Sequence, residues 1–190
     1  MKRLLSAVAL VALADTAVAQ DWSGAYVGVQ SANSSYTNRY FVDGVFDFSP
    51  VDGGGAMHGL FAGYNHQIGN VVVGGEIAYL IGKPAYDGSP EFFYTDMLDL
   101  KARAGYSVGR VLPYAVIGWS KTEWTNPGLL PVDADGMSYG LGVDIRVSDR
   151  VLVGLEYLKR DLVGDNWVEF PALNIEGDFS TVAFRVAYEF

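Results

Sequence analysis

The last eleven residues of the chain, STVAFRVAYEF from Ser180 to Phe190, alternate between two kinds of side chain. From Val182 onward the even positions are apolar or aromatic, and the odd positions are small or charged. A period of two residues is typical of a β-strand, because successive side chains point to opposite faces of a sheet. The segment therefore predicts a strand with one apolar face and one polar face.

The same alternation recurs upstream. It is strong in residues 71–79, 98–108, 137–147 and 151–157, and weaker in residues 22–32, 58–67 and 111–121. Several of these segments have about the ten residues that a tilted strand needs to cross a membrane. Together with the last segment they predict eight strands in an all-β protein.

The connectors between these segments alternate strictly in length. Short turns are expected at 68–70, 109–110 and 148–150, and long connectors at 33–57, 82–96, 122–136 and 161–179. In an up-and-down arrangement all long connectors then emerge at one end, with both chain termini at the other. Short periplasmic turns and long extracellular loops are typical of outer-membrane barrels. The sequence thus predicts an eight-stranded antiparallel transmembrane β-barrel with four long extracellular loops.

The polarity of the faces separates this interpretation from a soluble eight-stranded barrel. A soluble barrel carries its charges outside, whereas here the charges in mid-strand share a face with glycine and serine. The opposite face is aliphatic, with aromatic residues near both ends. The expected aromatic girdle comprises Tyr64, Tyr106, Tyr188 and Phe190 at the short-turn end and Tyr79, Tyr139 and Tyr157 at the long-loop end.

The first nineteen residues predict export. Lys2 and Arg3 precede an apolar run from Leu4 to Ala14, and Ala17-Val18-Ala19 provides the small residues that a signal peptidase recognises. We therefore expect a signal peptide at residues 1–19, a barrel domain at residues 20–190, and a location in the cell outer membrane.

Composition excludes several other classes of protein. The chain has 13 basic and 22 acidic residues, a formal charge of -9 that would repel a nucleic-acid backbone. It has no cysteine, which excludes disulfide scaffolds, thiolate metal sites and a cysteine nucleophile.

Several short motifs carry a family resemblance. QDWSGAYVG at 20–28 resembles the Trp-x-Gly-x-Tyr-x-Gly opening of the small porin-like outer-membrane proteins of alphaproteobacteria, the opacity-type or RopB-like barrel family. GYNHQ at 63–67 with Gly75-Glu76, ARAGY at 102–106, LPY at 112–114 and the final Phe190 are similar to that family in order and spacing. One departure is Val29-Gln30, where many members keep glycine. The resemblance implies an eight-stranded barrel whose terminal aromatic residue, Phe190, is an assembly signal.

The inward face predicts a network of paired charges in the lumen. Its members are Glu76, Asp99, Asp144, Glu156 and Glu189 against Lys101, Arg103, Arg146, Arg160 and Arg185. Five acids and five bases fit pairing, because an eight-stranded barrel has room inside for side chains alone and buried charges persist when paired. Glu76 and Arg103 are expected at similar height on adjacent strands. A selective pore would more naturally carry an excess of one sign.

Candidate catalytic and metal sites are weak, and we predict no catalytic, cofactor or metal residues. His58 and His66 are the two imidazoles, and neither is followed by the His-x-Ser arrangement of barrel lipases that deacylate lipid A. Asp133-Ala134-Asp135-Gly136 fits a turn better than a calcium loop, and the glycines at 53–55 lack the lysine and helix of a phosphate cradle. Both are expected in loops.

The first long connector predicts a projecting hairpin, since Asp43-Gly44 is flanked by aromatic and β-prone residues between Tyr40 and Phe48. We therefore expect a non-enzymatic outer-membrane barrel with an envelope-structural or surface-interaction role. Alternatives are a narrow passive diffusion channel and an outer-membrane lipid enzyme. Expected partners are outer-membrane lipid and lipopolysaccharide, the barrel-assembly machinery, and a host or surface ligand at the long loops.

Overall fold

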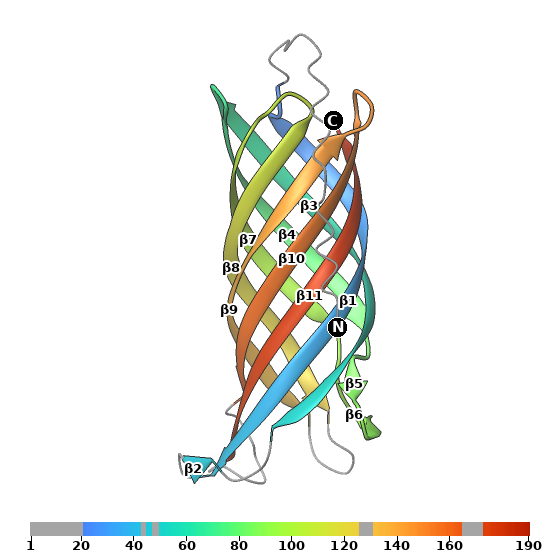
Figure 1. Cartoon of the computed structure of the whole chain (residues 1–190), viewed down its shortest axis with the longest axis vertical. Coiled ribbons are helices and arrows are strands. Elements are labelled where there is room, and N and C mark those ends of the chain that lie inside the picture. The colour runs from blue at the N-terminus through green and yellow to red at the C-terminus, as the bar shows by residue number, and fades with distance from the viewer. Residues whose placement is uncertain (1–20, 43–44, 47–49, 126–130, 165–172) are drawn as a thin grey trace, which may run out of the picture.

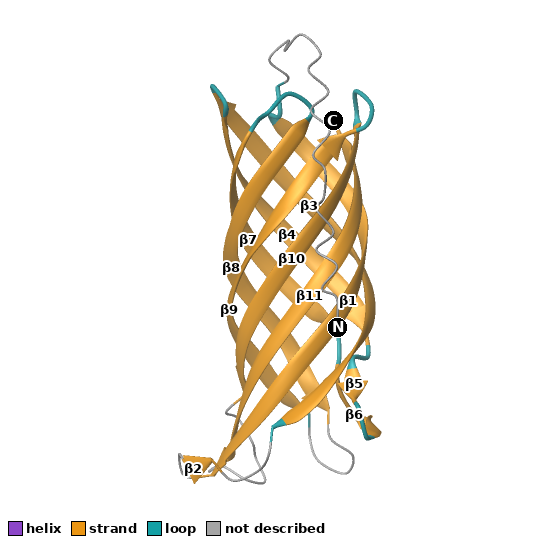
Figure 2. Cartoon of the chain, in the orientation of Figure 1, coloured by secondary structure: helices purple, strands orange, loops and turns teal. Residues whose placement is uncertain are grey.

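The structure, a computed structural model, describes residues 21–42, 45–46, 50–125, 131–164 and 173–190, so the predicted signal peptide lies outside the described residues. Every regular element drawn in Figure 2 is a strand. The eight long strands are β1 (Gly24–Val42), β3 (Val51–Ile68), β4 (Val71–Gly82), β7 (Met97–Tyr106), β8 (Val111–Thr125), β9 (Val132–Arg146), β10 (Val151–Gly164) and β11 (Leu173–Glu189). Three short ones are β2 (Val45–Phe46), β5 (Ala85–Tyr86) and β6 (Ser89–Tyr94).

The eight long strands close into an antiparallel barrel. Each pairs with the next in chain order, and β11 pairs back to β1 from Tyr26↔Glu189 to Val42↔Leu173 (Figure 1). Following the cross-strand partners once around from Tyr26 leads back to β1 at Tyr36, ten residues further along. Because this shift is even, a side chain that points inward on one turn also points inward on the next. The predicted fold is confirmed.

The two ends of the barrel differ as the connector lengths predict. The short turns and Phe190 lie at one end, the upper end of Figure 1, and β2, β5 and β6 lie at the other. Gly69 and Gly109 have φ near +60° in the short turns, a conformation that suits residues without a side chain. We call these ends the short-turn end and the long-loop end. Among the described residues, no helix is long and apolar enough to span a membrane.

The alternation of faces holds along every long strand. On β11, Val182, Phe184 and Tyr188 are exposed on the outer wall, whereas Arg185 and Glu189 are buried. The outer wall between the ends is aliphatic on the other strands too, as at Leu100, Leu141 and Leu155. Such a surface requires lipid, because a contiguous apolar band is unfavourable in water.

The long connectors are shorter than predicted, because the strand ladders continue into them. β1 and β3 pair as far as Asn38↔Val51, so the glycines at 53–55 belong to a strand and not to a loop. Asp133 to Gly136, expected as a turn, are in β9, where Asp133 pairs with Glu123. The predicted first hairpin is present as the pairs Phe41↔Phe46 and Val42↔Val45, although its turn lies outside the described residues.

The outer wall gives a direct test of the membrane band. Leu155 lies between the girdle residues of the short-turn end and those of the long-loop end, whereas Val163 on the same strand lies beyond the girdle residues of the long-loop end. Both side chains are exposed. We expect Leu155→Arg to lower the free energy of unfolding in lipid vesicles by about 2–4 kcal/mol, the cost of a cation near the bilayer midplane. Val163→Arg is the matched control and should change it little. Equal effects of the two would contradict this placement of the membrane.

Candidate functional site in the barrel lumen

The structure places all ten predicted lumen charges on the inner wall. Glu76 projects from β4, Asp99, Lys101 and Arg103 from β7, Asp144 and Arg146 from β9, Glu156 and Arg160 from β10, and Arg185 and Glu189 from β11. Each of these side chains is buried, and the ten are all the buried charged residues in the described part of the chain. Their positions follow from strand parity alone.

Six of the charges form one cluster in the middle of the lumen, which we call the central cluster. Lys101 Nζ lies 2.7 Å from Glu76 Oε1 and 2.6 Å from Glu156 Oε1. Arg185 spans the same two carboxylates, with Nη2 2.5 Å from Glu76 and Nη1 2.7 Å from Glu156. Arg103 lies 2.5 Å from Asp144 and 3.5 Å from Glu76. Three acids thus meet three bases, and the cluster has no net charge.

The other four charges form two separate pairs on either side of the central cluster. Toward the long-loop end, Arg160 binds Asp99 through two hydrogen bonds, from Nε at 2.8 Å and from Nη2 at 2.7 Å. Ser120 also donates to Asp99, at 2.6 Å. At the short-turn end Arg146 pairs with Glu189 at 2.5 Å. The lumen therefore holds three electrically neutral groups at three heights, as buried charges require.

Two tyrosines that the sequence interpretation missed complete the central cluster. Tyr26 Oη donates to Glu76 at 2.9 Å, and Tyr114 Oη donates to Glu156 at 3.1 Å. The guanidinium of Arg103 lies 3.8 Å from the centre of the Tyr114 ring, a cation–π contact. Both tyrosines occupy positions that the two-residue alternation of their strands assigns to the inner face, and this signal could have identified them.

Glycines directly opposite the two tyrosines on the adjacent strands make room for these rings, Gly63 beside Tyr26 and Gly142 beside Tyr114. A Cβ on Gly63 would lie 2.3 Å from Tyr26 Oη, and one on Gly142 would lie 2.3 Å from Tyr114 Cζ. The alternation of glycine with apolar residues therefore reflects packing inside the lumen as well as strand polarity.

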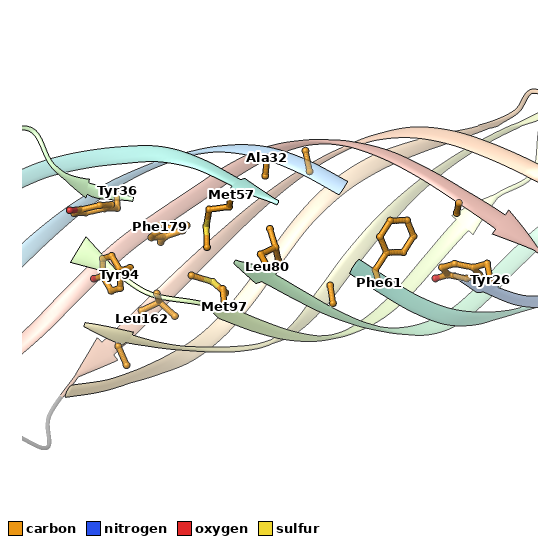
Figure 3. Packing of buried hydrophobic residues seen from close by; sticks show 14 of the residues in the cluster. Tyr26, Ala32, Tyr36, Met57, Phe61, Leu80, Tyr94, Met97, Leu162 and Phe179 are labelled. Atoms are coloured by element: carbon orange, nitrogen blue, oxygen red, sulfur yellow. The ribbon is translucent and has the colours of Figure 1, made fainter. Parts of the chain in front are cut away.

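An aromatic layer fills the lumen at the long-loop end. It consists of Tyr36, Tyr94, Trp124 and Phe179, all buried. The Tyr94 ring lies 5.0 Å from Tyr36, 4.7 Å from Trp124 and 5.4 Å from Phe179, measured between ring centroids. Met57, Met97 and Leu162 lie nearby on the inner side (Figure 3). This end of the lumen is thus packed like a protein core.

A tryptophan closes the short-turn end. Trp22 precedes β1 and is fully buried, and its Nε1 donates to the carbonyl oxygen of Gly109 at 3.3 Å. Arg146 lies over its ring at 4.5 Å and donates to the carbonyl oxygen of Asp21 at 3.0 Å. The first described residues are thus fixed across the mouth of the barrel.

The predicted girdle residues all lie exposed on the outer wall. They are Tyr64, Tyr106, Tyr188 and Phe190 toward the short-turn end and Tyr79, Tyr139 and Tyr157 toward the long-loop end. Tyr79 Oη donates to Asp96 at 2.6 Å, and Arg150 donates to Tyr188 Oη at 2.7 Å. A tyrosine side chain suits the boundary between lipid and water, because its ring is apolar and its hydroxyl group can bind a polar partner.

Beyond this girdle, the outer wall at the long-loop end carries exposed ion pairs. Asp178 accepts hydrogen bonds from Lys159 and Arg39, whose charged groups each lie 2.9 Å from it. These bonds, first that of Lys159, hold the pKa of the Asp178 carboxyl below its usual value. This part of the wall is therefore suited to water and not to lipid.

His58 and His66 are both exposed on the outer wall of β3, on the face opposite to the lumen charges. Among the described residues, no hydrogen bond joins either imidazole to a hydroxyl group, and no group of three or more histidine or acidic residues is placed to hold a metal ion.

Comparison with known proteins agrees with this architecture. The family model for the outer membrane protein beta-barrel domain matches residues 4–190. The chain belongs to this family. It is an outer-membrane protein, so the short-turn end is periplasmic and the long-loop end extracellular.

The relatives extend this identification. The chain is 26% identical over 170 residues to the 25 kDa outer-membrane immunogenic protein of Brucella melitensis, covering 87% of this chain and 76% of the relative. It is 29% identical over 173 residues to the protein of the same name from Brucella canis, with the same coverages. Among solved structures, Neisserial surface protein A superposes with a TM-score of 0.53 at 15% identity, covering 88% of this chain and 98% of that one. This last similarity shows the fold alone.

The Asp99–Arg160 pair allows a clean measurement of lumen pairing. We expect Arg160→Met to lower the free energy of unfolding by about 3–5 kcal/mol, because Asp99 is then a buried charge without its partner. Asp99→Leu combined with Arg160→Met removes both charges and should recover most of the loss. Chemical unfolding in vesicles measures both. A double variant as unstable as the sum of its single changes would show that the pair is not coupled.

Proposed function

We propose that this barrel is a closed, non-enzymatic envelope protein that stabilises the outer membrane and displays its extracellular loops for surface interaction. Residues 1–19 would be removed as a signal peptide before assembly. One observation carries the proposal: the lumen is filled along its length by neutral ion-pair groups and packed aromatic rings.

A diffusion channel requires a continuous water-filled path. Here Trp22 and the Arg146–Glu189 pair cross the periplasmic mouth, the central cluster crosses the middle, and the aromatic layer crosses the extracellular end. Eight strands enclose a space that side chains fill, whereas open porins use about sixteen strands. The balanced charges also lack the excess of one sign that favours ion passage. The packed lumen thus favours a structural role over the alternative of a narrow passive channel.

The extracellular half of the barrel supports a role in surface display. β1, β3 and β11 continue well past the outer girdle, and the outer wall there carries ion pairs such as Arg39–Asp178. Paired strands raise the loops on a rigid base, which suits recognition. The Brucella relatives are named as immunogenic outer-membrane proteins, which is consistent with surface exposure. We infer that lipopolysaccharide surrounds the outer wall and that a host or surface ligand binds the loops.

The histidines favour a non-enzymatic role over a lipid enzyme. A general base must lie within hydrogen-bond reach of its nucleophile. Both imidazoles lie on the outer wall, and no hydroxyl among the described residues is hydrogen-bonded to them. This arrangement supplies no catalytic pair.

A conductance measurement tests the closed lumen. We expect the refolded protein to give no stable conducting steps in a planar bilayer, with a sixteen-stranded porin in the same detergent as positive control. Folding is checked on the same sample by faster gel migration unheated than boiled. Reproducible conductance steps from correctly folded protein would overturn the proposal in favour of a channel.

Phe190 tests the proposed recognition by the barrel-assembly machinery. Its ring is exposed at the periplasmic girdle, 5.1 Å from that of Tyr188, and its amide donates to the Ala25 carbonyl oxygen at 3.0 Å. Deleting Phe190 removes no spanning residue, so stability after refolding in detergent should change little. Insertion in cells should fall markedly, because recognition would be lost.

The matched control for this deletion is Ile68→Ala, which trims an exposed apolar side chain at the same end of the barrel. It should leave insertion unchanged. Surface-accessible protein in cells is compared with refolding yield for each variant. Normal insertion without Phe190 would show that this residue is not an assembly signal.

A further inference from the structure

One section of the barrel wall is closed differently from the rest. β4 and β7 stop pairing at Leu80↔Met97, whereas β3 and β8 on either side continue toward the extracellular end. The gap is filled by residues 83–96, which contain β5 and β6 and which we call the strap. In Figure 1 the strap lies beside the lower end of the barrel.

The strap is held to the wall by short ladders. In the described part of the chain it pairs with β3 at Gly53↔Tyr86 and Gly54↔Ala85, and with β8 at Phe93↔Thr125 and Tyr94↔Trp124. One further backbone hydrogen bond extends each ladder, from Asp87 to the Asp52 carbonyl oxygen and from Thr95 to that of Glu123. Its own two strands are out of regular register between Ala85 and Tyr86. The neighbouring seam between β1 and β3 is instead continuous from Gly24 to Asn38. Segments with few backbone bonds open at lower free energy than continuous ladders.

The strap also supplies the centre of the aromatic layer. Tyr94 is 1% exposed, and its ring contacts Tyr36, Trp124 and Phe179, which all come from the long strands. Tyr94 Oη donates to Asn38 Oδ1 at 2.7 Å. The barrel strands therefore form an aromatic pocket, and the strap fills it with a phenol ring.

The filled pocket leaves hydrogen bonds unmade. Asn38 Nδ2 and Trp124 Nε1 are buried donors without an acceptor among the described residues, and both belong to residues that contact Tyr94. Asn38 is 0% exposed and Trp124 is 2% exposed. Buried unpaired donors are unfavourable, so they destabilise this closed arrangement. A ring with an acceptor group would satisfy donors that the Tyr94 ring does not.

We propose that the strap opens and that the pocket vacated by Tyr94 binds one small, neutral aromatic molecule with a hydrogen-bond acceptor. The size follows from the one fully buried ring in the described part of the strap, that of Tyr94, since Phe92 in the same segment is only partly buried against the core. An uncharged ligand suits the pocket because the rings that line it, from Tyr36, Trp124 and Phe179, are uncharged. The outer rim also disfavours anions, because acids such as Asp133, Asp135, Asp161 and Asp178 outnumber the bases Arg39, Lys121 and Lys159 there. The Asp99–Arg160 pair and the central cluster lie on the periplasmic side of the pocket, so binding does not depend on whether the lumen conducts ions.

A disulfide across the strap tests the opening. Phe93 and Thr125 face each other on paired strands, within the separation that a disulfide bridges, and the chain has no other cysteine to interfere. The variant carries Phe93→Cys and Thr125→Cys, and its reduced form is the matched control. The probe is 4-hydroxybenzamide, titrated calorimetrically into folded protein in detergent.

We expect saturable binding to the wild type and to the reduced variant, and a loss of at least about tenfold in affinity on oxidation, because the closed strap excludes the probe. p-Cresol, which has the ring and hydroxyl but no carbonyl acceptor, should bind about tenfold more weakly than 4-hydroxybenzamide. Tyr94→Ala should bind the probe more tightly than the wild type, since no ring has to leave the pocket first.

Two results would overturn the proposal. Equal affinity of the oxidised and reduced forms would show that the strap does not control access. If the probe binds to Tyr94→Ala but not to the wild type, the substitution itself has created the cavity and the wild-type strap does not open. The bilayer measurement on the same wild-type protein is independent, so failure here leaves the closed-lumen proposal standing.

Discussion

The narrow interior of an eight-stranded barrel is the constraint on which the rest of this structure depends. A closed sheet of this size has space for side chains and little else, so any charge that points inward is removed from water. Removing an ion from water is costly unless a partner of opposite sign and further hydrogen bonds compensate it. Three features of the lumen follow from this lack of space and of water. Five acids pair with five bases, tyrosine hydroxyls donate to Glu76 and Glu156, and glycines stand opposite the tyrosine rings.

Most of the fold could be predicted from the sequence because side chains alternate between the two faces of a strand, and the two faces of the barrel wall differ in polarity. The outer face contacts lipid, and the inner face lines a polar lumen. Parity alone placed Arg185 inside and Phe184 outside, and the same parity identified every charged residue of the lumen. Parity does not determine which charges meet. The expected neighbours Glu76 and Arg103 lie 3.5 Å apart, but Arg103 is closer to Asp144 on β9, a partner that depends on the ten-residue shift around the barrel.

The errors of the sequence interpretation fell where strands leave the membrane. The glycines at 53–55 and the acids at 133 and 135 are residues with low strand propensity, and both segments were expected in loops. Backbone pairing with β1 and β8 overrides that preference, and Gly53 gives space for the Tyr36 ring, which a Cβ there would approach within 2.5 Å. The insertion of Tyr94 from a short hairpin left no periodic signal in the sequence.

The central cluster also bears on how the chain enters the membrane. Its six members come from β4, β7, β9, β10 and β11, and Glu76 and Arg185 are 109 positions apart in the chain. A partly assembled sheet that lacks the last strand would present Glu76 and Glu156 without Arg185, either to lipid or to an open edge. Such an intermediate is disfavoured by the same electrostatics that stabilise the finished barrel. Neutralisation of the central cluster is therefore coupled to the arrival of β11, the last of the five strands that supply its charges.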